Sequence, residues 1–180
     1  LLLRDVLPTD FPAIYRLQTN LVVTRHLDYI RTENEEQARD WIDAVIYHNA
    51  LVPRRSYNLT VVRQSDDEIL GWIGIGHPDE PEYGELDFAY AIQPEHWGQG
   101  YATEALAAII TLGFEAFDVN TIYGECDAKN VASARVMEKA GLRRVSTEGE
   151  DVIFAITCAE WTRDCDKYAI RRTYGGKDGD

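Results

Sequence analysis

The sequence predicts an α/β fold, with α+β character, in which helices cover the faces of a mixed β-sheet. The chain has 180 residues, a length typical of one domain of about 100–200 residues. Hydrophobic residues make up 45 % of the chain and aromatic residues 11 %, which is enough to build a core without metal or disulfides. The predicted order of elements is β-α-α-β-β-β-α-β-α-β-β, which is neither regular βαβ alternation nor separate blocks of strands and helices.

The N-terminal third is predicted to contain one strand and two helices. Leu1–Val6 is typical of a short strand, and Pro8–Gln18 of a helix, because Pro and Asp are favourable in a first turn. Thr32 and Glu35 have the spacing of a capping box that begins a second helix, which ends before Pro53. The apolar residues of that helix recur on one face, namely Ala38, Trp41, Ile42, Val45 and Ile46.

Three strands are predicted next. Tyr57–Arg63 and Ile69–Ile75 form a hairpin around a turn at Ser65–Glu68, and Glu85–Ile92 is the third strand. The glycines of Gly71–Gly76 imitate a dinucleotide-binding motif, but they lie inside a strand with no helix after it. They indicate close backbone approach within the sheet.

The remaining elements alternate between helix and strand before a final strand pair. The expected ranges are a helix over Thr103–Phe117, a strand over Thr121–Cys126, a helix over Asn130–Ala140 closed by Gly141, and strands over Leu142–Ser146 and Val152–Cys158. We expect residues 1–163 to form a single domain and the polar residues 164–180 to form a flexible tail.

Charge and cysteine usage limit the binding partners and the cellular compartment that the sequence predicts. With 18 Lys+Arg against 31 Asp+Glu the formal net charge is −13, which argues against a nucleic-acid partner and favours a cationic or neutral one; it could equally serve solubility alone. Three cysteines without a C-x-x-C pair indicate a reducing, cytoplasmic setting. Scattered histidines predict no metal site, and the apolar runs are too short for a membrane span. Leu1–Leu3 is followed at once by Arg4 and Asp5, which is not typical of a signal peptide.

The segment Gln93–Leu106 places two glycines, Gly98 and Gly100, between a strand and an apolar helix. Such a turn directs several backbone N–H groups at a ligand from the positive end of a helix, which suits a phosphate. A P-loop is excluded because no Lys follows Gly100. A tight turn with a purely structural role is the alternative.

Two segments resemble one family. Trp97-Gly98-Gln99-Gly100-Tyr101-Ala102-Thr103-Glu104-Ala105, followed by Asn130-x-x-Ser133-x-x-Val136-Met137-Glu138-Lys139-Ala140-Gly141-Leu142, resembles the GNAT superfamily of acetyl-CoA-dependent N-acetyltransferases. The subgroup of ribosomal-protein N-terminal acetyltransferases is the most similar. The family's pyrophosphate motif, Gln/Arg-x-x-Gly-x-Gly/Ala, falls on Trp97–Ala102, where Trp97 replaces the usual polar residue.

The resemblance implies acetyl-CoA as cosubstrate and no metal. The residues that it assigns to acetyl-CoA binding are Ile92, Trp97, Gly98, Gln99, Gly100, Tyr101, Ala102, Thr103, Asn130 and Ser133. Lys129, Arg135 and Lys139 could meet the 3′-phosphate of the cosubstrate or remain surface cations.

For catalysis, Glu85 and Asp87 project from one face of their strand and are candidates for the general base, with Asp87 favoured by the resemblance. Both could instead be solvated surface residues. The family's oxyanion donors are backbone N–H groups around Tyr90–Ile92. The helix after Asn130 has no Tyr to protonate the thiolate, and Ser133 is expected to donate a hydrogen bond to sulfur instead. The rival interpretation makes Asn130 a helix N-cap and Ser133 an ordinary first-turn residue.

The resemblance implies acetyl transfer to a primary amine, either a protein N-terminus or a small cationic amine. The acidic run Asp79–Glu82 leads toward Glu85 and is expected to line the acceptor side. An acyl-CoA-binding sensor or interaction module without turnover is the alternative. The sequence does not decide between a monomer and a dimer.

Overall fold

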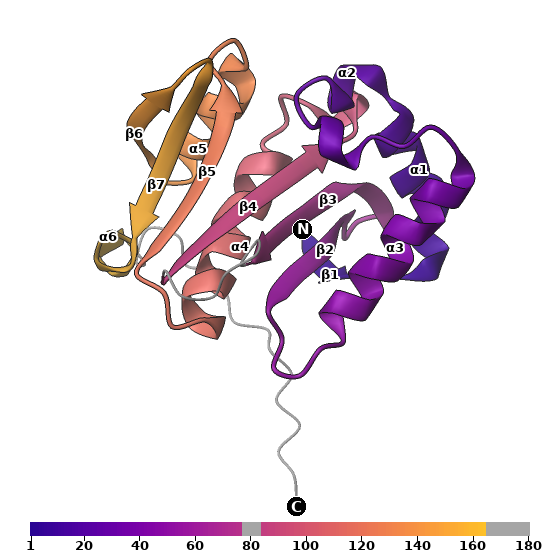
Figure 1. Ribbon diagram of the computed structural model, residues 1–180, viewed down its shortest axis with the longest axis horizontal. Helices are drawn as coiled ribbons and strands as arrows, with labels where there is room; N and C mark the ends of the chain where they lie inside the picture. The colour runs from indigo at the N-terminus through magenta and orange to yellow at the C-terminus, as the bar shows by residue number, and fades with distance from the viewer. Residues whose placement is uncertain (77–83, 165–180) are drawn as a thin grey trace, which may run out of the picture.

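The computed structural model describes residues 1–76 and 84–164, which contain one seven-stranded sheet with the strand order β1-β2-β3-β4-β5-β7-β6 (Figure 1). The strands are β1 (Leu2–Asp5), β2 (Ser56–Arg63), β3 (Glu68–Gly76), β4 (Glu85–Ile92), β5 (Thr121–Asp127), β6 (Arg143–Glu148) and β7 (Asp151–Thr157). Neighbouring strands are antiparallel except for β4 and β5, which run parallel. The expected mixed sheet is therefore confirmed.

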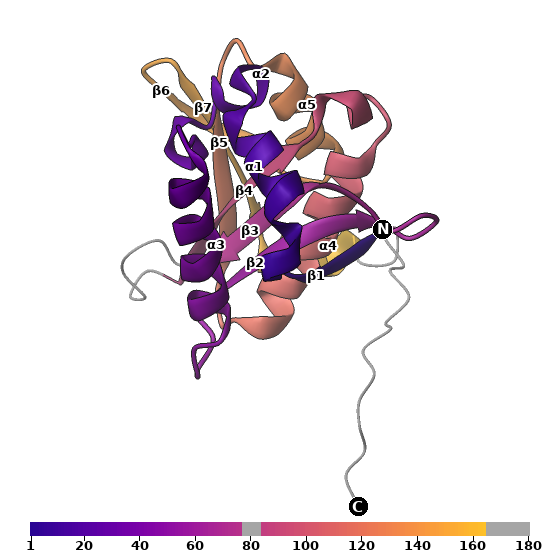
Figure 2. The same cartoon turned by 90° about the vertical axis from the view of Figure 1, so that its right-hand side faces the viewer.

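The helices form a layer on each face of the sheet. They are α1 (Phe11–Thr19), α2 (Leu21–Thr24), α3 (Glu35–Asn49), α4 (Tyr101–Ala116), α5 (Val131–Lys139) and α6 (Cys158–Asp164), with 3₁₀ turns η1 (Pro8–Asp10), η2 (Asp28–Ile30) and η4 (Pro94–His96). Figure 2 shows α3 and α4 on opposite sides of the sheet.

Strand alternation explains the two layers. Trp72 and Ala91 belong to the apolar cluster under α1 and α3, whereas their chain neighbours Ile73 and Ile92 belong to the cluster under α4 and α5. Buried apolar residues therefore occupy both faces of the central strands. A Cβ on Gly71 would lie 2.0 Å from the carbonyl oxygen of Ala91, which confirms the expected close backbone approach.

The predicted capping box is wrong. The N-cap of α3 is Asn34, whose side chain accepts a hydrogen bond from the Gln37 N–H at 3.0 Å. The Gln37 side chain in turn accepts from the N–H of Glu33 at 2.8 Å. Two overlapping capping signals are present, and the later one begins the helix, because Asn is at least as good an N-cap as Thr. The short elements α2, η2 and α6 were not predicted.

The pairing of β4 with β5 is short, and this positions the site. Only Glu85, Leu86 and Asp87 pair with β5, opposite Thr121–Tyr123. The pairing ends at Asp87. The two strands then diverge (Figure 1), while β5 stays paired with β7 as far as Asp127. The second half of β4 therefore has an unpaired edge that faces away from β3.

Candidate active site

A cleft of about 870 Å³ opens where β4 and β5 separate. Its walls come from the α2–η2 segment, β4, the loop that enters α4, β5 and α5. These elements are distant in sequence, so the sheet and its helices together form the cleft. In the described residues no helix has both the length and the apolar character of a membrane span, and no three His, Cys, Asp or Glu side chains are grouped for a metal ion.

The unpaired edge of β4 supplies backbone groups to the cleft. The Gln93 N–H donates to the Leu70 carbonyl of β3 at 2.8 Å, and hydrogen bonds alternate along an antiparallel pair. The N–H groups of Tyr90 and Ile92 therefore point away from β3, toward the gap. The Ile92 carbonyl accepts a hydrogen bond from the Trp97 indole at 2.7 Å. Trp97, the departure from the family motif, thus holds the loop to the end of β4.

The loop at the start of α4 presents open backbone. Gly98 and Gly100 have φ values of +74° and +89°, which favour glycine, and a Cβ on either would meet no atom within 4 Å. Gly100 is the N-cap of the 16-residue helix α4 and has no side chain with which to cap it. The first N–H groups of α4 have no intrahelical partner and no side-chain cap, and they lie at the positive end of a helix whose first residues line the cleft, which fits a pyrophosphate.

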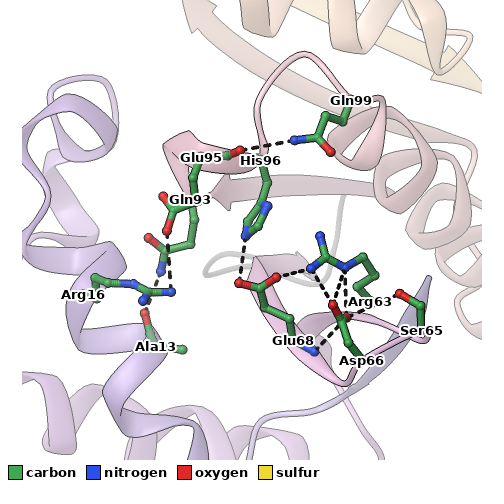
Figure 3. A network of polar contacts seen from close by, with 10 residues as sticks. All are labelled: Ala13, Arg16, Arg63, Ser65, Asp66, Glu68, Gln93, Glu95, His96 and Gln99. Carbon is green, nitrogen blue, oxygen red and sulfur yellow. Dashed lines mark hydrogen bonds and ion pairs between the residues drawn. The ribbon is translucent and has the colours of Figure 1, made fainter.

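Polar contacts attach this loop to neighbouring elements of the fold (Figure 3). The His96 side chain, buried on η4, lies with Nε2 3.4 Å from a carboxylate oxygen of Glu68 on β3. Glu68 is also paired with Arg63 at the end of β2. On the other side, the Gln93 side chain donates to the Ala13 carbonyl of α1 at 2.9 Å. The loop is therefore attached both to the β2–β3 hairpin and to α1.

The start of α5 faces β4 across the cleft. The Asn130 side chain accepts a hydrogen bond from the Ser133 N–H at 3.2 Å, so Asn130 is the N-cap of α5, as the structural interpretation expected. The Ser133 hydroxyl lies 2.8 Å from the phenol oxygen of Tyr90. Ser133 therefore points toward the sheet, and both residues line the cleft.

Tyr90 was not among the candidate side chains. The family's tyrosine belongs to the helix after Asn130, which has none in this chain, whereas the structure supplies the phenol hydroxyl of Tyr90 from β4. Burial raises the pKa of Tyr90 to about 12, although the hydrogen bond with Ser133 opposes that rise. Its sequence signal was weak, since an aromatic residue on a central strand is usually part of the core.

The opposite end of the cleft is acidic. Asp87 lines the cleft, but Glu85 is exposed and does not, because the cleft begins only where pairing with β5 ends. Asp28 and Glu125 also line it, and Tyr29 lies among them. Although 65 % of Tyr29 is exposed, desolvation and then the carboxylates of Asp87, Glu125 and Asp28 raise its pKa to about 12. The expected acidic run Asp79–Glu82 lies outside the described residues.

The cations expected near the 3′-phosphate separate into two groups. Arg135 and Lys139 line the cleft on α5. Lys129 does not line it, and its ammonium lies 3.2 Å from the Glu150 carboxylate. Of the other residues assigned by resemblance, Ile92, Trp97, Tyr101, Ala102, Thr103 and Asn130 line the cleft, whereas Gln99 does not. The Gln99 side chain donates to the Glu95 carbonyl at 3.2 Å.

Comparison with known proteins gives the family. A family model described as an acetyltransferase (GNAT) domain matches residues 1–143. The uncharacterized N-acetyltransferase YoaA of Bacillus subtilis is 30 % identical over 146 residues, which cover 80 % of each chain.

Solved structures share the fold. A spermidine N-acetyltransferase from Vibrio cholerae, in complex with CoA and spermine, has a TM-score of 0.75 at 16 % identity over 89 % of this chain and 97 % of its own. The ribosomal alpha-N-protein acetyltransferase RimL, in complex with CoA, has a TM-score of 0.74 at 18 % identity over 86 % and 92 %. The chain therefore belongs to the GNAT family of acetyltransferases, and it is an acetyl-CoA-dependent N-acetyltransferase.

Proposed function

We propose that this enzyme acetylates a cationic primary amine that enters the cleft at its acidic end, while acetyl-CoA occupies the end formed by the Gly98–Thr103 loop. The observation that carries the proposal is the polarity of one continuous cleft. Open backbone N–H groups lie at one end, and the carboxylates of Asp28, Asp87 and Glu125 line the other. The unpaired edge of β4 runs between them.

The loop end fits a polyanion despite the net charge of −13. Backbone amides and a helix N-terminus bind phosphate without a formal positive charge. Arg135 and Lys139, which line the same cleft from α5, could meet a further phosphate. The Ile92 N–H, directed into the gap, is suited to the amide-containing arm of the cosubstrate.

The chemistry requires few side chains. The substrate ammonium loses a proton to Asp87, directly or through water, and the free amine attacks the acetyl carbon. The N–H groups near Tyr90 stabilise the resulting oxyanion. The carbon–sulfur bond then breaks, the nitrogen loses its second proton, and the CoA thiolate takes up a proton while Ser133 donates a hydrogen bond to sulfur. The balance is one amide, one CoA thiol and one proton released.

The acceptor is inferred from the acidic end. Carboxylates that raise the pKa of Tyr29 also create a negative potential that attracts an ammonium group. Relatives of this fold are named for spermidine and for a ribosomal protein N-terminus, and both carry such a group.

The test is a thiol-release assay with acetyl-CoA and a panel of acceptors. The panel contains spermidine, a short peptide with a free N-terminus, the same peptide with an acetylated N-terminus, and a neutral alcohol. We expect CoA release with spermidine or the free peptide and none with the other two, with the acetylated product identified by mass spectrometry. Tight CoA binding without amine-dependent release would contradict the proposal.

A further inference from the structure

We propose that Tyr90 is a positioning residue that directs the hydroxyl of Ser133 toward the sulfur of the bound cosubstrate. This inference rests on the proposed function, because it assumes that the CoA sulfur reaches Ser133. It assigns a role to a strand residue that the family motif does not include.

The contact joins the two walls of the cleft. Tyr90 belongs to β4 and Ser133 to the first turn of α5, and their hydroxyl oxygens lie 2.8 Å apart. The Ser133 carbonyl is a weaker alternative partner, at 3.4 Å from the phenol oxygen. The Tyr90 ring stacks on Phe88, with ring centroids 6.4 Å apart and planes inclined by 15°.

Phe88 is itself held in place. A Cβ on Gly124 of β5 would lie 2.4 Å from the Phe88 ring, so this ring lies directly against the glycine backbone. The stack therefore fixes where the Tyr90 phenol can lie. A residue with this support can hold another side chain in a defined orientation.

The proposal assigns one direction to this hydrogen bond. Burial raises the pKa of Tyr90 to about 12, so the phenol keeps its proton at neutral pH. The Ser133 oxygen is the nearer of its two partners, and either hydroxyl can donate across the 2.8 Å contact. With Tyr90 as the donor, the proton of Ser133 is free to point at a third group.

Ser133 already lies near a sulfur-bearing side chain. Cys126 lines the cleft on β5, and burial raises the pKa of its thiol, an effect that Ser133 opposes. A hydroxyl at this place is suited to stabilise a thiolate.

The test measures the acidity of the bound CoA thiol. The ultraviolet absorbance of the thiolate is followed against pH for the CoA complex, and the complex with desulfo-CoA is subtracted to remove the protein's own groups. We expect Tyr90→Phe, which keeps the ring, to raise the pKa of bound CoA by about one unit. In the amine assay, kcat should fall about tenfold with little change in the KM for acetyl-CoA.

A double-mutant cycle separates positioning from general support. Ser133→Ala should raise the pKa of bound CoA at least as much as Tyr90→Phe, and the double variant should show no further rise. The matched control is Tyr57→Phe, another partly buried tyrosine of the sheet, which packs on Phe117 and does not line the cleft. This control should leave the pKa unchanged. Melting temperatures verify folding, and Tyr90→Leu replaces Tyr90→Phe if the latter does not fold.

The outcomes are distinct. If CoA does not bind the wild-type enzyme, the proposed function fails and this inference fails with it. If CoA binds and its pKa is the same in Tyr90→Phe as in the wild type, only the role of Tyr90 is refuted. If the pKa of bound CoA is higher in the double variant than in Ser133→Ala, Tyr90 does not act through Ser133.

Discussion

In the proposed function, the two ends of the cleft recognise charge by different means. The cosubstrate end consists largely of backbone, with Gly98, Gly100 and the start of α4 presenting N–H groups to open space. The acceptor end consists of side chains, with carboxylates of Asp28, Asp87 and Glu125 around Tyr29. A protein with a net charge of −13 can therefore offer a site for a polyanion and a site for a cation within one cleft. The two ends should also respond to different substitutions.

The largest effect is expected at the backbone end. Gly100→Trp should raise the Kd for CoA at least about 1000-fold, because a bulky side chain would block two or more charge-assisted hydrogen bonds. Isothermal titration calorimetry measures this change. The matched control is Gly149→Trp, since Gly149 also has a positive φ and open space around it, but lies in the turn between β6 and β7. Equal loss in both variants would show only general strain.

At the acceptor end, the two strand carboxylates should differ. Asp87→Asn should lower kcat/KM for the amine about 100-fold, as expected for loss of a general base, and leave the Kd for CoA unchanged. Glu85→Gln should change kcat/KM less than about twofold, because Glu85 is exposed and outside the cleft. A larger loss from Glu85→Gln than from Asp87→Asn would reverse the assignment.

The carboxylates of Asp28 and Glu125 should act on the amine through their electrostatic potential. The double variant Asp28→Asn with Glu125→Gln should raise the KM for the amine about fivefold and weaken its dependence on salt. The KM for acetyl-CoA serves as the internal control and should stay constant. A parallel rise in both KM values would mean that the two ends are not separate.

The same double variant should alter Tyr29. Nearby carboxylates disfavour the phenolate, so their neutralisation should lower the pKa of Tyr29 from about 12. The fall should be partial, because desolvation is the larger cause of the raised value. A difference titration of tyrosine absorbance against a Tyr29→Phe reference gives this value. An unchanged pKa of Tyr29 would mean that the carboxylates lie too far from Tyr29 to act on the acceptor.

The smallest effect is expected from the contacts behind the loop. Glu68→Gln removes the charge that pairs with Arg63 and faces His96, so the Kd for CoA should rise about threefold. Glu150→Gln, which removes the exposed pair with Lys129, should leave the Kd unchanged. Equal Kd values for the two variants would show that the contacts of the β2–β3 hairpin with the loop do not contribute to cosubstrate binding.

Local signals explain what the sequence predicts well. The bounds expected for Glu85–Ile92 agree with β4, and the glycine-rich turn before α4 lies where its motif indicated. The misplaced start of α3 arose because two capping signals overlap within Thr32–Gln37. The four-residue helix α2 spans only about one turn, which is too short for an apolar periodicity to show, so packing rather than local pattern determines it.

Long-range contacts explain what the sequence does not predict. Tyr90 and Ser133 are 43 residues apart, and no periodicity links a strand residue to a side chain on a later helix. The alternation along β4 places Glu85 and Asp87 on one face. The difference between them depends on where β4 stops pairing with β5, which is a property of the whole sheet.

The most direct test of the account uses one ligand that reaches both ends of the cleft. A bisubstrate analogue, in which CoA is joined through an acetyl linker to spermidine, is titrated into the wild-type enzyme and into the Asp28→Asn, Glu125→Gln variant. We predict that the wild type binds the analogue at least about tenfold more tightly than CoA, and that the variant loses most of this advantage while binding CoA equally well. Equal affinity of the wild type for the analogue and for CoA would contradict an acidic acceptor end.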